Sequence, residues 1–170
     1  MWVKTGEIGQ EYKIQPCGTE ALSTLRIEMG HIAGSELDGR TIPYDNSLEG
    51  LVSKKKDFIG KRSLDREAFI ADDRQKVVGV VPIDKKTSIP EGSHLVKDAL
   101  APIPNPKLGY ISASCWSVEY DNPFSLAILK DGKNMIGQKL FAMSPLKNKT
   151  IPVEIVSSHY VDPKGERVRS

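Results

Sequence analysis

The stretch TIPVEI at residues 150–155 carries the pattern on which the predicted fold rests. Its apolar residues Ile151, Val153 and Ile155 alternate with Thr, Pro and Glu, as in a β-strand with one face in a core. Five more stretches have strand character, as apolar runs or alternating segments. They are residues 76–81, 93–96, 108–116, 124–129 and 138–141. About six short strands separated by glycine and proline turns predict a small closed barrel or a sandwich.

Two of these strands carry more specific expectations. On the strand at 108–116, simple alternation places Ile111, Ala113 and Cys115 on one side. The strand at 76–81 is expected to end at Pro82, because proline cannot donate a ladder hydrogen bond.

The chain before residue 72 reads as helices and loops instead. A helix is predicted over residues 18–30, capped by Thr19 and stopped by Gly30. A second amphipathic helix is predicted over residues 58–70, although Gly60 weakens its first turn. The change of pattern predicts an α+β protein whose helical part comes first.

Composition excludes several classes of protein. The 170 residues suit one domain or two small ones, and 39% hydrophobic with 27% charged residues is normal for a globular chain. The formal charge is only +2, so a nucleic-acid partner is not expected. Two cysteines exclude a disulfide scaffold. The N-terminus lacks the apolar core of a signal peptide and no spanning stretch occurs, so a cytoplasmic chain without a membrane partner is expected.

Motifs for catalysis and metal binding are absent from the sequence. It contains no GxSxG, HExxH, Walker or GxGxxG pattern, so no catalytic residue is predicted. His31, His94 and His159 are too scattered to suggest a metal site.

Glu28 is unusual for its place in the sequence. A carboxylate in the last turn of a helix opposes the helix dipole at a cost of about 0.3–1 kcal/mol, and this one is flanked by two apolar residues. One explanation is a salt bridge to Arg26, Arg40 or Lys56. The other is a carboxylate held to receive paired N–H donors from a heterocyclic ligand.

The run Lys54–Lys56 also allows two interpretations. It is either a solvated loop or an anion site formed by three ammonium groups before the start of a helix.

Longer motifs resemble the folate-dependent aminomethyltransferase family, which includes the glycine-cleavage T-protein and the α subunit of heterotetrameric sarcosine oxidase. The segment LRIEMG (25–30) matches the family's LRxExG helix end, and DGRTIP (38–43) matches its D-G-x-x-x-P loop. KKKDFIGK (54–61) matches K-x-x-D-F-I-G-[KR], and GYISASCWS (109–117) is similar to a strand of the family's C-terminal barrel. The SKKK loop and the tail DPKGER (162–167) look most like the sarcosine oxidase α branch. The resemblance covers essentially the whole chain.

The resemblance implies folate binding. The glutamate matching Glu28 binds the pteridine ring of tetrahydrofolate in this family, and Lys56 matches a basic position near the folate. Trp116 matches an aromatic position that lines the site, while Tyr44 and Tyr160 are weaker candidates. Flavin and NAD are expected only on other parts of a complete enzyme.

The resemblance also implies a domain arrangement. Residues 1–72 would be the C-terminal part of a truncated α/β folate-binding domain, and residues 74–165 a small antiparallel β-barrel. The long region that relatives carry before the equivalent of Trp2 would come from the remainder of an α subunit or from a complementary chain, and the apolar surface left without it demands a partner. Other sarcosine oxidase subunits would be further partners.

The implied activity is support for the oxidative demethylation of sarcosine to glycine, with one-carbon transfer to tetrahydrofolate. The chain alone is expected to be inactive. Two alternatives stay open: a T-protein type of aminomethyltransferase, and a non-catalytic scaffold with a degenerate folate site.

Overall fold

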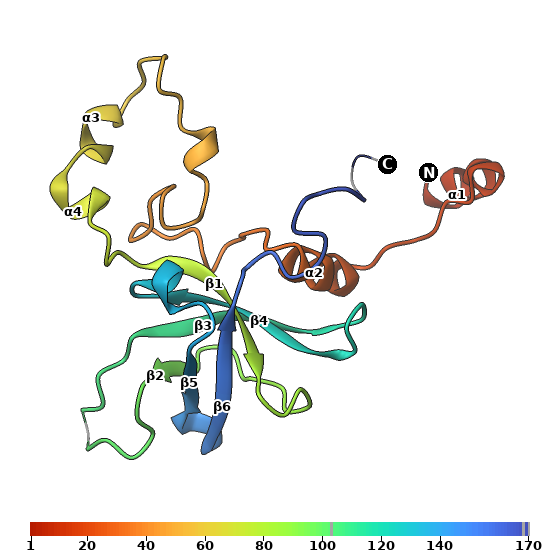
Figure 1. The fold of residues 1–170 in the computed structure, drawn as a ribbon. Coiled ribbons are helices and arrows are strands. Elements are labelled where there is room, and N and C mark those ends of the chain that lie inside the picture. Colours follow the sequence, from red (N-terminus) through yellow and green to blue (C-terminus); the bar gives the residue numbers. More distant parts are fainter. Residues whose placement is uncertain (103, 168, 170) are drawn as a thin grey trace.

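In residues 1–102, 104–167 and 169, which the computed structural model describes, six antiparallel strands close into a barrel (Figure 1). They are β1 Lys76–Pro82, β2 His94–Val96, β3 Gly109–Ser117, β4 Asn122–Leu129, β5 Lys139–Ser144 and β6 Lys149–Val156. Around the barrel they follow the order β1-β4-β3-β2-β5-β6. The predicted α+β class with an antiparallel barrel is confirmed, and Pro82 is the last residue of β1 rather than the first beyond it.

The helical segments lie mostly in the first seventy residues. They are α1 Trp2–Gly9, η1 Gln10–Tyr12, α2 Thr19–Glu28, η2 Glu49–Leu51, α3 Lys61–Leu64 and α4 Glu67–Ile70, with η3 Gly132–Met135 and η4 Pro145–Lys147 later in the chain. Figure 1 shows α2 against the barrel, α1 beyond it at the end of a connecting stretch, and α3 and α4 on the opposite side. Within the described residues, no helix is long and apolar enough to cross a bilayer.

Two apolar clusters hold these elements together. The barrel interior is filled by side chains such as Leu95, Leu129 and Val153. The outer cluster lies between α2 and the sheet β1-β4-β3, where Ile27 packs with Phe124 and neighbouring residues. Strand β4 is buried along its whole length because each of its faces points to one cluster. Each fully buried aliphatic side chain contributes about 1.5–3 kcal/mol, so covering both faces stabilises the fold strongly.

A β-bulge changes the side-chain pattern of β3. Ile111 pairs with Ala127 and Ala113 with Leu126, so Ser112 is an extra residue in the ladder. Ile111 therefore points into the barrel, whereas Ala113 packs in the outer cluster. The prediction that Ile111, Ala113 and Cys115 share one side is wrong, because one extra residue reverses the alternation that follows it. After the bulge, Ala113 and Cys115 of β3 therefore face the outer cluster, which also contains Ile27 of α2.

The predicted helix over residues 58–70 is wrong as a single element, since it is two separate turns. Gly60 has a left-handed φ of 93°, and Arg66 is extended with ψ 138°. Most of this segment is exposed, so little tertiary packing compensates for breaks in so short a helix.

The helix predicted over residues 18–30 is observed as α2, with a different N-terminus. Gly18 occupies the N-cap position, and Thr19 is the first helical residue. No side chain makes a capping hydrogen bond there, so the predicted cap at Thr19 is wrong. An extended glycine leaves the free amides of the first turn to solvent at a small cost.

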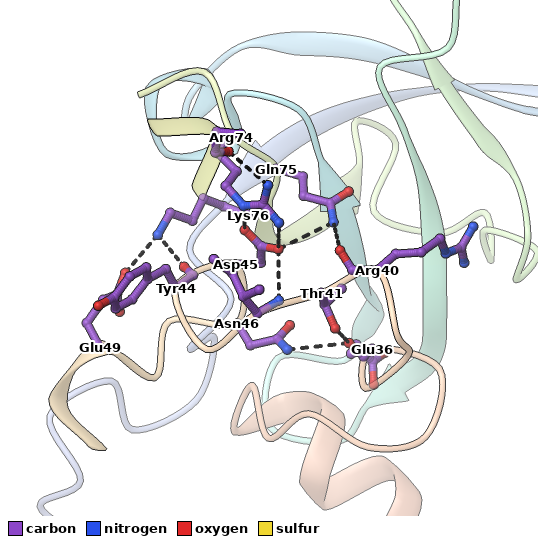
Figure 2. A network of polar contacts seen from close by, with 12 residues as sticks. Glu36, Arg40, Thr41, Tyr44, Asp45, Asn46, Glu49, Arg74, Gln75 and Lys76 are labelled. Carbon is purple, nitrogen blue, oxygen red and sulfur yellow. Dashed lines mark hydrogen bonds and ion pairs between the residues drawn. The ribbon is translucent and has the colours of Figure 1, made fainter. Parts of the chain in front are cut away.

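A buried ion pair fixes the loop after α2 to the barrel (Figure 2). The Asp45 side chain is 1% exposed and accepts hydrogen bonds from Arg74 Nε (2.6 Å) and Nη2 (2.8 Å). The backbone carbonyl of Asp45 accepts the Val77 N–H of β1 at 2.8 Å. At the other end of the loop, buried Glu36 accepts a hydrogen bond from Arg26 of α2 at 3.0 Å. These contacts link α2, the loop and β1 in one network.

Asp45→Asn should lower the free energy of unfolding by about 3 kcal/mol, because it leaves the Arg74 charge without its buried anion. Asp38→Asn is the matched control, since Asp38 pairs with Arg40 at the surface of the same loop and exposed pairs contribute little. Urea denaturation measures both variants. Equal midpoints for the two would contradict the importance of the Asp45–Arg74 pair.

Candidate functional site

The C-terminus of α2 is held in one conformation by a Schellman motif. The His31 N–H donates to Arg26 O at 2.7 Å and the Gly30 N–H to Ile27 O at 3.0 Å. Gly30 has a φ of 69°, and a Cβ atom there would lie 2.6 Å from the Ser158 carbonyl oxygen. Both the left-handed conformation and this close approach require glycine. The predicted stop at Gly30 is confirmed, and it fixes where the last helical residue, Glu28, is placed.

Glu28 is tied to the barrel through both its side chain and its backbone. It is 5% exposed, and its Oε1 accepts hydrogen bonds from Ser117 Oγ (2.6 Å) and the Val118 N–H (3.0 Å). Its carbonyl oxygen accepts the N–H groups of Tyr160 (3.2 Å) and Val161 (3.0 Å). The carboxylate is thus held between the end of β3 and the segment after β6.

The second carboxylate oxygen of Glu28 is differently placed. Oε2 accepts no hydrogen bond within the described part of the chain. It is not sealed from solvent, because Asn46 Oδ1 is the one buried side-chain oxygen or nitrogen atom there that lacks a partner. One oxygen is therefore anchored by the protein while the other is available.

The ion-pair explanation of Glu28 is not borne out. Arg26 pairs with Glu36, and Arg40 pairs with Asp38. Among the residues that the structure describes, Glu28 forms no salt bridge. A carboxylate held only by two donors on one oxygen has hydrogen-bonding capacity left for a further partner.

Tyr160 lies beside Glu28, with its ring on the outer cluster. The ring stacks on Phe124 with centroids 4.2 Å apart and 4° between planes, and its hydroxyl group hydrogen-bonds the Asn122 side chain. Its backbone N–H bonds to Glu28. The structure therefore brings Tyr160 and Glu28 together.

The Trp116 side chain lies on the face of β3 opposite to the face that carries Ser117. It immediately precedes Ser117, whose side chain turns to Glu28, so the alternation of the strand sends the indole the other way. Trp116 is 45% exposed, and its Nε1 donates to Asp121 Oδ1 at 3.2 Å.

Tyr44 and Lys56 lie in other parts of the molecule. Tyr44 lines a cavity of about 520 Å³ with Phe69 and Lys76, and Lys76 Nζ donates to the Tyr44 carbonyl oxygen (Figure 2). Lys56 is exposed in the loop between η2 and α3, where its carbonyl oxygen accepts Lys61 Nζ at 2.9 Å. This loop projects from the barrel away from α2 (Figure 1). Neither residue is brought to Glu28.

Ser117 is the contact that sequence reasoning missed. It lies inside the quoted motif at residues 109–117, two residues after Cys115. A signal existed in the sequence, since alternation puts Ser117 and Cys115 on the same face. The sequence gives no indication, however, that this face of the strand meets the end of α2.

The thiol of Cys115 reflects the electrostatics of this region. Burial raises the pKa of Cys115 to about 12, and the negative charge of Glu28 adds to the increase. Cys115 is therefore a packing residue of the outer cluster and a poor nucleophile.

Large apolar side chains are exposed on α1 and α2. On α1, Trp2 is 77%, Val3 72% and Ile8 61% exposed; on α2, Leu22 is 61% and Leu25 52% exposed. We call these five residues the N-terminal apolar surface. These large apolar side chains on the two helices are left without a cover in the described part of the chain.

The fold is similar to that of an aminomethyltransferase of known structure. A crystal structure of the glycine cleavage system aminomethyltransferase T from Bartonella henselae superposes with a TM-score of 0.73 at 19% identity, over 95% of this chain and 44% of that one. An aminomethyltransferase of Thermoanaerobacter sp. (strain X514) is 29% identical over 94% of this chain and 41% of its own length. No family model matches the chain.

Nearly all of this chain also matches part of sarcosine oxidase subunit alpha. Identity is 38% over 164 residues with the Rhizobium meliloti (strain 1021) protein and 37% over 170 residues with that of Corynebacterium sp. (strain U-96). These matches cover 95% and 98% of this chain, but only 16% and 17% of the relatives. The resemblance predicted from the sequence is confirmed, and the chain spans about one sixth of the length of these two relatives.

Gly30→Ala should lower the free energy of unfolding by about 2 kcal/mol or more, because a left-handed φ strains alanine and its Cβ meets the Ser158 carbonyl. Gly34→Ala serves as the control, since a Cβ there has nothing within 4 Å. Chemical denaturation compares the two. A Gly30→Ala midpoint equal to that of the control would show that the end of α2 is not constrained.

Native iodoacetamide labelling at pH 8 should modify Cys17 and leave Cys115 nearly untouched. Cys17 is exposed, whereas a thiol with a pKa of about 12 is ionised to only about one part in 10⁴ at this pH. Peptide mass spectrometry measures both sites, with labelling in urea as the control. Equal native labelling rates would contradict the assigned environment of Cys115.

Proposed function

We propose that this chain is the folate-binding C-terminal portion of a sarcosine oxidase α-type polypeptide. It would support the oxidative demethylation of sarcosine to glycine, with transfer of the one-carbon unit to tetrahydrofolate. The observation that carries the proposal is the Glu28 carboxylate, which is buried, has no cationic partner among the described residues, and keeps Oε2 available. The similarity to sarcosine oxidase subunit alpha supports the particular reaction.

The chemistry of Glu28 suits a pterin. With Oε1 held by Ser117 and Val118, Oε2 can accept a charge-assisted hydrogen bond from an N–H donor of a planar heterocycle. Bound tetrahydrofolate would supply the amine that takes up the one-carbon unit. The task of this chain is then to hold the pterin in a fixed orientation, which raises the effective concentration of the reacting amine.

Of the other residues predicted to contact the folate, Tyr160 has a contact with Glu28 that supports its role. The backbone contact of Tyr160 with Glu28 supports Tyr160 as a wall beside the pterin. Lys56, Tyr44 and Trp116 are proposed contacts of the rest of the ligand.

The N-terminal apolar surface supports a protein partner. The proposed partner is polypeptide corresponding to the parts of the relatives that this chain does not span, since five exposed apolar side chains on α1 and α2 require a cover. In this proposal, residues 1–72 complete a folate-binding domain together with that polypeptide, residues 74–165 form its barrel domain, and the assembly works in the cytoplasm. The chain alone would not catalyse the reaction.

Two alternatives differ in their supporting observations. A T-protein type of aminomethyltransferase is favoured by the matches to aminomethyltransferases. The Thermoanaerobacter sp. (strain X514) match is 29% identical, lower than the 38% found for the Rhizobium meliloti sarcosine oxidase subunit alpha. A scaffold without folate would use Glu28 only to attach α2 to the barrel.

Titration of tetrahydrofolate by calorimetry tests the proposal. The wild-type chain should bind, and Glu28→Gln should bind roughly ten- to a hundredfold more weakly, because charge-assisted hydrogen bonds become neutral ones. Glu20→Gln, on the exposed first turn of α2, should bind like wild type. Equal binding by wild type and Glu28→Gln would favour the scaffold, and binding by neither would favour either the scaffold or a pocket that this chain alone leaves incomplete.

A further inference from the structure

The hydrogen bond between Ser117 and Glu28 is buried and directional. Ser117 is 0% exposed, and its Oγ lies 2.6 Å from Glu28 Oε1. The same Oγ accepts the Tyr120 N–H at 3.4 Å. Because a hydroxyl group has a single hydrogen, the one on Ser117 is committed to the carboxylate.

This bond decides which carboxylate oxygen faces outward. Ser117 and the Val118 N–H both converge on Oε1, so rotation of the carboxyl group would break two hydrogen bonds. Oε2 is left as the oxygen without a protein donor. Within the described residues, no other side chain of α2 hydrogen-bonds to a barrel strand. The rigid end of β3 therefore orients the carboxylate.

We propose that Ser117 is a positioning residue for Glu28, setting the orientation in which the available Oε2 oxygen meets an N–H donor of a pterin. This inference rests on the folate-binding function proposed above. Ser117 itself would not touch the ligand, and its effect on binding would pass entirely through Glu28. A geometry held in advance avoids ordering the carboxylate when the ligand arrives.

The test is tetrahydrofolate titration of Ser117 variants in two backgrounds. Ser117→Ala removes the donor, and Ser117→Cys keeps the side-chain volume with a poor donor. In the wild-type background both should weaken binding roughly tenfold. In the Glu28→Gln background neither should weaken it further, because the group they position has been changed.

Ser112→Ala is the matched control. Ser112 is a buried serine on the same strand whose hydroxyl donates to Leu126 O at 3.2 Å, inside the barrel sheet and not to Glu28. The Ser112→Ala variant should bind tetrahydrofolate like wild type, while its urea denaturation midpoint falls by an amount comparable to that of Ser117→Ala. Denaturation midpoints of all variants identify any that fail to fold, and Ser117→Cys then replaces Ser117→Ala.

The outcomes separate the inference from the function on which it rests. Wild-type binding by both Ser117 variants, with binding lost in Glu28→Gln, would overturn the positioning role and leave folate binding intact. Equal weakening in both backgrounds, or by Ser112→Ala, would also overturn it, as a general structural effect. Unchanged binding in Glu28→Gln would overturn the proposed function itself.

Discussion

The outer face of β4 is the constraint on which the site depends. The side chains of Phe124, Leu126 and Ile128 point away from the barrel interior. Exposing them to water would lower the stability of the fold by several kcal/mol. Helix α2 covers this face by inserting Ile27. The residue next to Ile27 is then necessarily carried to the end of β3, and that residue is Glu28. An ionisable group is buried at this point because its apolar neighbour must be.

The loop network extends this constraint to the rest of the helical half. Arg26, on α2, holds buried Glu36, while Asp45 holds Arg74 just before β1. Each carboxylate is buried with a partner and further donors, the condition under which buried charge is tolerated. Helix α2 is thus attached at its C-terminus by Glu28 and, through the loop, to the first strand. The segment with α3 and α4 is attached near its end, where Arg74 Nη1 donates to the Ala68 carbonyl oxygen at 3.2 Å. The rest of this segment projects from the barrel (Figure 1).

Local periodicity predicted the elements better than their contacts. The strands were recognisable because apolar runs and alternation reflect one or two buried faces, as in β4 and β6. The bulge at Ser112 was not, because one extra residue leaves no mark in the composition of the strand. The helix predicted over residues 58–70 failed because Gly60 and Arg66 break it and most of its residues are exposed, so packing does little to compensate. Glu28 stood out by opposing the helix dipole, but its partner Ser117 lies 89 residues away, a distance over which sequence spacing carries no information.

Closure of the barrel also limits how this chain can assemble with another. A sheet with an open edge offers a row of unpaired N–H and C=O groups to which a second polypeptide can add a strand. Here β1 and β6 pair with each other and complete the ring. Any further polypeptide would therefore be recognised through side chains, and the specificity of that contact would depend on the shape of their packing instead of backbone pairing.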